Sequence, residues 1–339
     1  MTLALKRSGE PSGIEAPYAS DRDLSHRPRD RKSAFRLFEN AGRRRLWLGL
    51  AALLGALLYP AMMVVSSQVG DRNLSGIVDK TRWTSQWAGA AAGLIERQYS
   101  DLGWTPDAHW LSPAAHLTAK PAFQQALSSA VGDYIGLMAD MSGEGSAEGP
   151  DRDLVAASRL ISASSSVAQL HAGRQALVSY DRRQRRVGGA QRLGDEQARQ
   201  VEMIRTWALE GKRDIARLTE SSGSAVVSRD ATIAVYTAKA RAQAAYVFLE
   251  AMEIAQDPKL IRDRRIALDA WRDAARFRPL FVLNGSREGS VWGNHVVSMG
   301  FLLVEAEAAT ADLLASLRSR EGEAMVVSSA ETSFDTAVN

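Results

Sequence analysis

The residues with the greatest potential for chemistry lie in a glycine-rich stretch near the C-terminus, residues 278–301. Ser286 and His295 are the types that hydrolases pair as nucleophile and base, but no identifiable acid orients the histidine. The stretch also lacks the G-x-S-x-G motif and the phosphate-binding glycine motifs. We therefore expect no catalytic residue and interpret the stretch as a candidate binding loop. Its members are Asn284, Gly285, Ser286, Gly289, Trp292, Gly293, Asn294 and His295.

The same loop also has a purely structural interpretation. Gly285, Gly289 and Gly293 recur at every fourth residue, which allows a tight turn and close helix packing. Asn294 is a residue type that caps helices, and a helix is predicted to follow it. If the loop does bind, the free N–H groups at the start of that helix suit an anion or a carboxylate.

A second candidate site lies in a proline-broken loop, residues 101–117, with the sequence DLGWTPDAHWLSPAAHL. Two histidines together with Asp101 or Asp107 form a conceivable set of metal ligands. The seven-residue spacing of the histidines matches no zinc motif, so we expect neither a metal nor a cofactor. Tryptophan beside proline is more typical of a loop pinned to a core. The secondary candidate residues are Trp104, His109, Trp110 and His116.

Composition excludes several classes of protein. The chain has 339 residues, of which 45% are hydrophobic, so it is not disordered as a whole. It has no Cys, which removes disulfides, zinc fingers and thiol nucleophiles. Its 42 basic and 39 acidic residues are unevenly spread, because the first 45 residues hold 11 basic and 6 acidic ones. The remainder is close to neutral, so no nucleic-acid partner is expected.

An uncharged run follows the basic segment. Residues 46–65, LWLGLAALLGALLYPAMMVV, contain no charge, and 20 helical residues span about 30 Å, the thickness of the bilayer hydrocarbon. We therefore predict one transmembrane helix, with the bilayer as a partner of the chain. A cleaved signal peptide is the alternative, but the run is longer than a signal peptide's apolar region and no clear cleavage motif follows it.

The charge on either side of this run sets the orientation. The membrane anchor is predicted to comprise Arg43, Arg44, Arg45 and Trp47. Because basic residues remain in the cytoplasm, residues 1–45 are expected to be a disordered, basic cytoplasmic tail. Everything beyond residue 66 is then exported.

The exported part has helical periodicity throughout, so the predicted fold class is all-α, an elongated helical bundle over residues 66–321. Apolar residues at 3/4 spacing define the elements. Ser228 and Asp257, the latter followed by Pro258, are predicted to cap the helices that they precede. The expected helices cover 71–99, 121–141, 151–180, 195–221, 228–256, a segment from Pro258 to Ala275, and 296–320.

Three segments break this pattern. Residues 142–150, SGEGSAEGP, are predicted to be a loop or an interdomain linker. Residues 181–195 combine five Arg with three Gly and are interpreted as a solvated connection, with an Arg patch for phosphate groups as the alternative. Residues 322–339 are expected to be a disordered C-terminal tail.

Residues 283–299, LNGSREGSVWGNHVVSM, resemble the C-terminal signature of an uncharacterised bacterial family of single-pass membrane proteins, domain of unknown function 2333. The N-terminal apolar run and the Trp/Pro-rich loop before Pro121 are similar to that family too, so the resemblance covers about residues 46–320. It implies a bacterial inner-membrane protein with a periplasmic helical domain. The family has no assigned catalytic residues, so none are carried over.

The sequence thus favours a non-enzymatic envelope protein that acts as a scaffold or as an accessory subunit of a membrane assembly. Its expected partners are other envelope or membrane proteins, with a second copy of the chain as one possibility. A periplasmic sensor that binds a lipid, glycan or anion is the alternative. A hydrolase that uses Ser286 and His295 is the third and weakest hypothesis.

Overall fold

The structure is a computed structural model, and its chain divides into two compact units, residues 1–57 and 58–339. In the first unit it describes only four positions, Trp47, Leu50, Leu53 and Leu54, all of them helical and exposed. In the second unit it describes Val69, Leu74, Ile77, 82–110, 112–144, 146–187, 195–220, 228–279, Val282 and 294–338, with side chains as far as Arg320.

The predicted membrane helix, 46–65, therefore lies outside the described residues apart from these four positions. Arg43, Arg44, Arg45 and the remainder of the predicted cytoplasmic tail are outside them as well. Among the residues that are described, no helix is both long enough and apolar enough to cross a membrane.

The described residues form eight α-helices, one short 3₁₀ helix and no strand, which confirms the all-α prediction. The elements are α2 (Gln86–Ser100), η1 (Pro113–His116), α3 (Ala119–Gly143), α4 (Arg152–Ser162), α5 (Val167–Val187), α6 (Asp195–Glu220), α7 (Arg229–Ala251), α8 (Pro258–Arg276) and α9 (His295–Val338).

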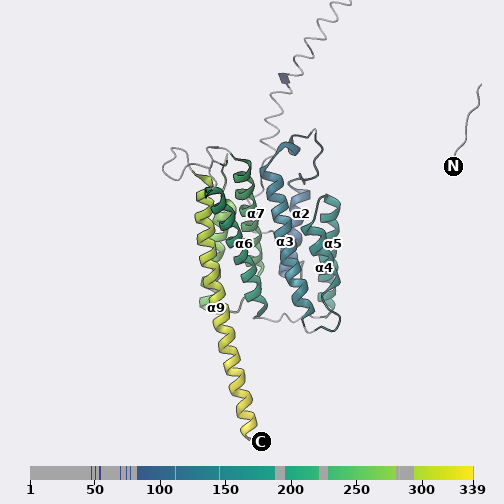
Figure 1. Ribbon diagram of the computed structural model, residues 1–339. Helices are drawn as coiled ribbons and strands as arrows, with labels where there is room; N and C mark the ends of the chain where they lie inside the picture. Colours follow the sequence, from purple (N-terminus) through teal and green to yellow (C-terminus); the bar gives the residue numbers. More distant parts are fainter. Residues whose placement is uncertain are drawn as a thin grey trace, which may run out of the picture. The chain divides into compact units, whose positions relative to one another are not determined.

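These helices pack as two four-helix bundles that lie side by side (Figure 1). In the first bundle α2, α3, α4 and α5 each pack against the next helix, and α5 packs back against α2. In the second bundle α6, α7, α8 and α9 form the same closed cycle. The α3–α4, α4–α5, α6–α7 and α7–α8 connections are short, whereas α2–α3 and α8–α9 are joined by longer ones. Each bundle runs up, down, up and down (Figure 1). Helix α7 joins the bundles because it also packs against α2 and α3.

Side-chain caps fix most of the helix starts. The Ser228 hydroxyl accepts a hydrogen bond from Ala231 N, and the Asp257 carboxylate accepts from Lys259 N. The Asn294 Oδ1 atom accepts from Val297 N at 3.1 Å. These three caps confirm the sequence predictions, since each satisfies an N–H group that the first helical turn leaves free.

The helix predicted over 151–180 is wrong as a single element, because it breaks at 163–166 into α4 and α5. The Ser166 hydroxyl accepts from Gln169 N, while the Gln169 Oε1 atom accepts from Ser165 N at 2.7 Å. Ser and Gln three residues apart are the sequence signature of a capping box. The serine run therefore starts a new helix instead of continuing the old one.

Two other boundary predictions also need correction. Residues 142–150 are not an interdomain linker, because they connect α3 to α4, which pack directly against each other. Residues 181–187 belong to α5 and are not a solvated connection. In the first case the close packing of α3 on α4 turns the Gly/Ser/Glu run into the turn of a helical hairpin.

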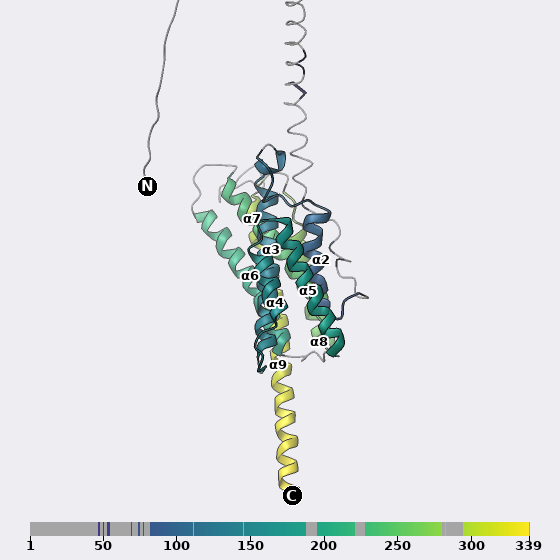
Figure 2. The same ribbon diagram turned by 90° about the vertical axis from the view of Figure 1, so that its right-hand side faces the viewer.

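The C-terminal tail predicted to be disordered over 322–339 is helical as far as Val338. Helix α9 is 44 residues long and continues past the other helices of the bundle (Figure 2). Apart from Gly322, residues 321–338 contain neither Gly nor Pro, so no strong helix-breaking residue ends the helix there.

Aromatic side chains fill the junction between the two bundles. The rings of Tyr134 on α3 and Phe248 on α7 stack with their centroids 3.8 Å apart and an interplanar angle of 4°. Trp87 on α2 lies against both Tyr134 and Tyr180, with centroids 6.2 and 5.6 Å away. The Tyr134 hydroxyl donates to Gln200 Oε1 on α6 at 2.8 Å, so this buried phenol has its polar partner.

Because these phenols are buried, the free energy of unfolding is predicted to fall at alkaline pH. Desolvation raises the pKa of Tyr180 to about 12, with nearby carboxylates such as Asp151 adding to the rise, and it raises the pKa of Tyr134 further. Unfolded tyrosines ionise near pH 10, so the unfolded state loses protons first. The free energy of unfolding should therefore be at its full value below about pH 10 and fall between about pH 10 and 12.

Spectroscopic titration of tyrosinate absorbance tests this expectation. Of the seven tyrosines in the chain, Tyr134 and Tyr180 should ionise only as the helical circular dichroism signal is lost. A Tyr180→Phe variant should lack the absorbance change of one of the two tyrosines that ionise only on unfolding. Ionisation of all tyrosines near pH 10 in the folded chain would contradict the assignment.

Candidate functional site

Loop 101–118, the segment between α2 and α3, is tied firmly to the first bundle. Thr105 donates to Gln124 Oε1 from its backbone N–H at 2.9 Å and from its hydroxyl at 2.6 Å. Gln124 donates in turn to the Gly103 carbonyl at 2.9 Å, and Lys120 donates to the Leu102 carbonyl. Trp104 is buried between these contacts, so it serves as the hydrophobic anchor of the loop.

The other three candidate residues of this loop are exposed. The Trp110 side chain is 69% exposed, and its ring centroid lies 5.9 Å from that of His109. His116 Nε2 is 3.0 Å from the Trp110 carbonyl oxygen, which fixes the backbone of the loop tip. No group of three or more potential metal ligands occurs within the described part of the chain, and the two histidines are not brought together with a carboxylate.

The glycine-rich candidate loop is described only at its end. Asn284, Gly285, Ser286, Gly289, Trp292 and Gly293 lie outside the described residues, so the binding role of this loop stays a prediction. Asn294 caps α9, and the half-buried His295 ring lies 6.1 Å from Phe277. The prediction that Asn294 caps the last helix is therefore confirmed.

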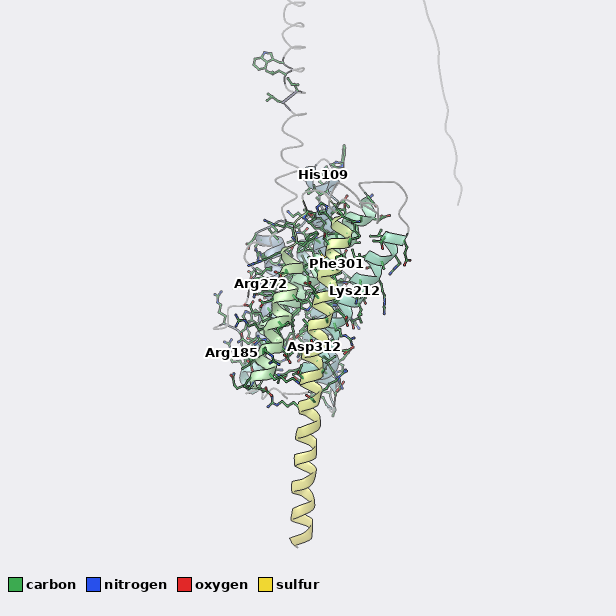
Figure 3. All side chains as sticks on the ribbon, turned by 90° about the vertical axis from the view of Figure 1, so that its left-hand side faces the viewer. His109, Arg185, Lys212, Arg272, Phe301 and Asp312 are labelled. Carbon is green, nitrogen blue, oxygen red and sulfur yellow. The ribbon has the colours of Figure 1, made fainter. Side chains whose placement is uncertain are left out.

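The described residues of the two candidate segments nevertheless lie at one end of the bundle. Figure 3 places His109 at the end where α9 begins. The up-and-down path puts the end of α8 and the start of α7 there as well. From the sequence, these segments were predicted as two separate sites. Their position at the same end of the bundle follows from how the helices are connected.

Sequence reasoning missed a groove near this end. A cleft of about 320 Å³ lies between α3 and α7 and is lined by Pro121, Ser129, Arg229 and Ile233, among others. A second cleft of about 260 Å³, between α6 and α7, shares Ile233 and Thr237 with it. No local sequence pattern could have revealed this groove, because α3, which forms one wall of it, is distant in the chain from α6 and α7.

Charged groups line the wall of this groove. Arg241 on α7 forms an ion pair with Glu210 on α6, with 2.7 Å between Nη2 and Oε2. Burial raises the pKa of Asp133 on α3, and a hydrogen bond from the Ser129 hydroxyl acts in the opposite direction. Arg229 is exposed and forms no ion pair with any residue that the structure describes.

Two of the four described arginines of 181–195, Arg183 and Arg185, have structural partners. Arg183 forms ion pairs with Asp151 and Asp153 at the start of α4. Arg185 donates to the Arg82 carbonyl at 2.7 Å and pairs with Asp181, whose carboxylate accepts from Ser85 N at the start of α2. These guanidinium groups hold helix ends together, which argues against a phosphate-binding patch.

Helix α9 presents two large apolar side chains to solvent. Phe301 is 67% exposed and Val304 is 46% exposed. They are three residues apart, so they are neighbours on one face of the helix. The inward side of α9 packs against α6, α7 and α8.

Comparison with known proteins gives no relative from which to transfer a site. The resemblance of residues 283–299 to an uncharacterised membrane-protein family therefore stays a prediction. No protein-family model, curated protein or solved structure matches this chain.

Proposed function

We propose that the protein is a non-enzymatic scaffold or accessory subunit of a bacterial envelope assembly. It is anchored in the inner membrane by residues 46–65, with its N-terminus in the cytoplasm and its helical bundle in the periplasm. The 20 uncharged residues behind three consecutive arginines support the anchor and its orientation. The resemblance described above supports the location.

The observation that carries the scaffold role is the apolar face of α9. Phe301 and Val304 are exposed next to each other and beside Glu305, whereas the inward side of this helix packs on the bundle. An exposed pair of large apolar side chains on a rigid helix suits docking of a partner protein. The bundle holds this face in place, so the partner meets a preorganised surface.

Affinity purification after crosslinking in cells tests the scaffold role. The full tagged chain should recover a stoichiometric partner, which is either another envelope protein or a second copy. The double variant Phe301→Ser/Val304→Ser should lose it. The matched control is Ile261→Ser/Ile266→Ser on α8, since these two side chains are 44% and 52% exposed.

The control variant should retain the partner, because its changes lie on a different helix. A wild-type chain that crosslinks to nothing and migrates as a lone monomer after gentle detergent extraction would contradict the scaffold role. Equal recovery by both double variants would show that the face of α9 is not the docking surface.

A second candidate function is binding of an anionic envelope molecule, which is favoured by the cleft between α3 and α7. Arg229 supplies a positive charge with no ion pair among the described residues, and Ser129 and Thr237 supply hydroxyls. Native mass spectrometry of the full chain with phosphatidylglycerol should then show a bound lipid that Arg229→Gln loses. The exposed Arg318 on α9, which pairs with Glu202 and lines neither cleft, provides the control variant Arg318→Gln.

A further inference from the structure

Three described residues between the predicted membrane span and α2 pack on the bundle. Val69 and Leu74 are 6% and 2% exposed, and the backbone oxygen of Ile77 lies so near Gly93 of α2 that a Cβ there would be 2.6 Å away. Arg278, just beyond the end of α8, donates to the Val69 carbonyl at 3.4 Å. The chain thus reaches the bundle at the end where α8 stops and α9 begins.

We call this the Trp110 end, because loop 101–118 lies there too (Figure 3). The opposite end carries the α3–α4 turn, residues 144–151, and the α7–α8 connection, residues 252–257.

Chain length then limits how far the Trp110 end can lie from the bilayer, if the anchor of the proposed function holds. Val69, which is buried, follows Val65, the last residue of the predicted span, by only four residue steps. At most about 3.6 Å per residue, they reach about 14 Å. The headgroup region extends roughly 5 to 8 Å beyond the hydrocarbon on each side. The Trp110 end is therefore held at the level of the headgroups or just above them.

The Trp110 end exposes apolar side chains of the kind that a membrane contact requires. At the Trp110 end the indole of Trp110 is 69% exposed, and the α4–α5 turn, Ala163 to Ser166, has no charge. Val167, which follows that turn, is 40% exposed. The opposite end carries ion pairs, such as Arg199 with Glu144. An ion pair between Arg217 and Asp214 lies near the Trp110 end as well.

Exposure of Trp110 is built into the loop. Trp104 is buried, Thr105 is bonded to Gln124, and His116 holds the Trp110 carbonyl, so the loop presents one tryptophan inward and the other outward. A large exposed indole on an otherwise well-anchored loop has no packing role in the bundle. Tryptophan favours the interface between water and lipid, where its ring is partly apolar and its N–H stays hydrated.

We infer that the Trp110 end of the bundle rests on the headgroups of the bilayer that holds residues 46–65, and that the Trp110 side chain inserts into this interface. The ligand is the lipid surface itself. This inference rests on the membrane anchor of the proposed function but not on the scaffold role.

Site-specific labelling of the full chain tests the inference. Because the chain has no Cys, one introduced Cys is a unique labelling site. Ala115→Cys labels the Trp110 end and Ala147→Cys labels the opposite end, at two alanines that are both exposed. The labelled chains are reconstituted in vesicles of phosphatidylethanolamine and phosphatidylglycerol that contain a lipid with a quencher on its headgroup.

A fluorophore at residue 115 should be quenched several-fold more than one at residue 147. Trp110→Ser in the Ala115→Cys chain should lower that quenching toward the level at residue 147. Equal quenching at the two positions, in a chain that stays in the vesicles at alkaline pH, overturns this inference alone. A chain that alkaline washing removes from the vesicles overturns the membrane anchor, and the inference with it.

Discussion

Replacing Trp271 with alanine should lower the free energy of unfolding by about 3–5 kcal/mol. Trp271 on α8 is fully buried, and its Nε1–H donates to Thr310 Oγ1 on α9 at 2.8 Å. The Thr310 hydroxyl donates onward to the Ala306 carbonyl at 2.6 Å. The substitution leaves a large cavity and removes the indole that links α8 to α9, so it combines two costs.

Chemical denaturation of the full chain in detergent, followed by circular dichroism, measures this effect. Trp110→Ala is the matched control, since the same change at an exposed side chain should cost at most about 0.5 kcal/mol. Trp271→Phe should fall in between, because it keeps most of the volume and loses only the N–H donor. A Trp271→Ala chain within about 1 kcal/mol of wild type would contradict the packing described for α8 and α9.

Gly132→Ala should destabilise the first bundle by about 1–3 kcal/mol, partly offset by up to about 1 kcal/mol of helix propensity. A Cβ at Gly132 of α3 would lie 1.9 Å from the Ser162 hydroxyl and 2.7 Å from the Ser162 backbone nitrogen. Since Ser162 ends α4, part of the obstacle is backbone and cannot rotate away. The two helices must separate to admit the methyl group.

Gly136→Ala, one turn further along α3, is the control and should be neutral or stabilising. Its Cβ would meet only the Ser158 hydroxyl, at 3.1 Å, and that side chain can move. The two variants therefore differ in the sign of their effect, although the substitution is the same. Denaturation curves that shift equally for both would refute the close approach of α3 and α4 at Gly132.

Local signals in the sequence predicted most helix starts correctly, but they did not predict the break between α4 and α5. Ser228, Asp257 and Asn294 were recognisable as caps because each precedes an apolar 3/4 repeat. The break at 163–166 was missed because apolar residues recur on both sides of it, and periodicity outweighed the Ser166–Gln169 capping box. The break matters for the fold, because α4 and α5 are separate members of the first four-helix cycle.

The candidate sites were harder to predict than the helices. Sequence reasoning selected unusual residue types, and so it gave Trp104 and Trp110 the same status. Burial separates them, since one anchors the loop and the other faces solvent. The groove over Ile233 and the exposed pair on α9 depend on which helices become neighbours, and single-helix patterns carry no information about that.

The position of α7 between the two four-helix cycles has a consequence for how the chain folds. Most packed helices are close in sequence, which favours rapid formation of local helix pairs. The two four-helix cycles cannot be separated without loss of contacts, however. Helix α7 belongs to the second cycle, and its Phe248 side chain stacks on Tyr134 of the first. A fragment that ends in the α5–α6 connection would expose that aromatic surface to water. We therefore expect the two halves to unfold in a single cooperative transition, despite a topology that looks like two domains.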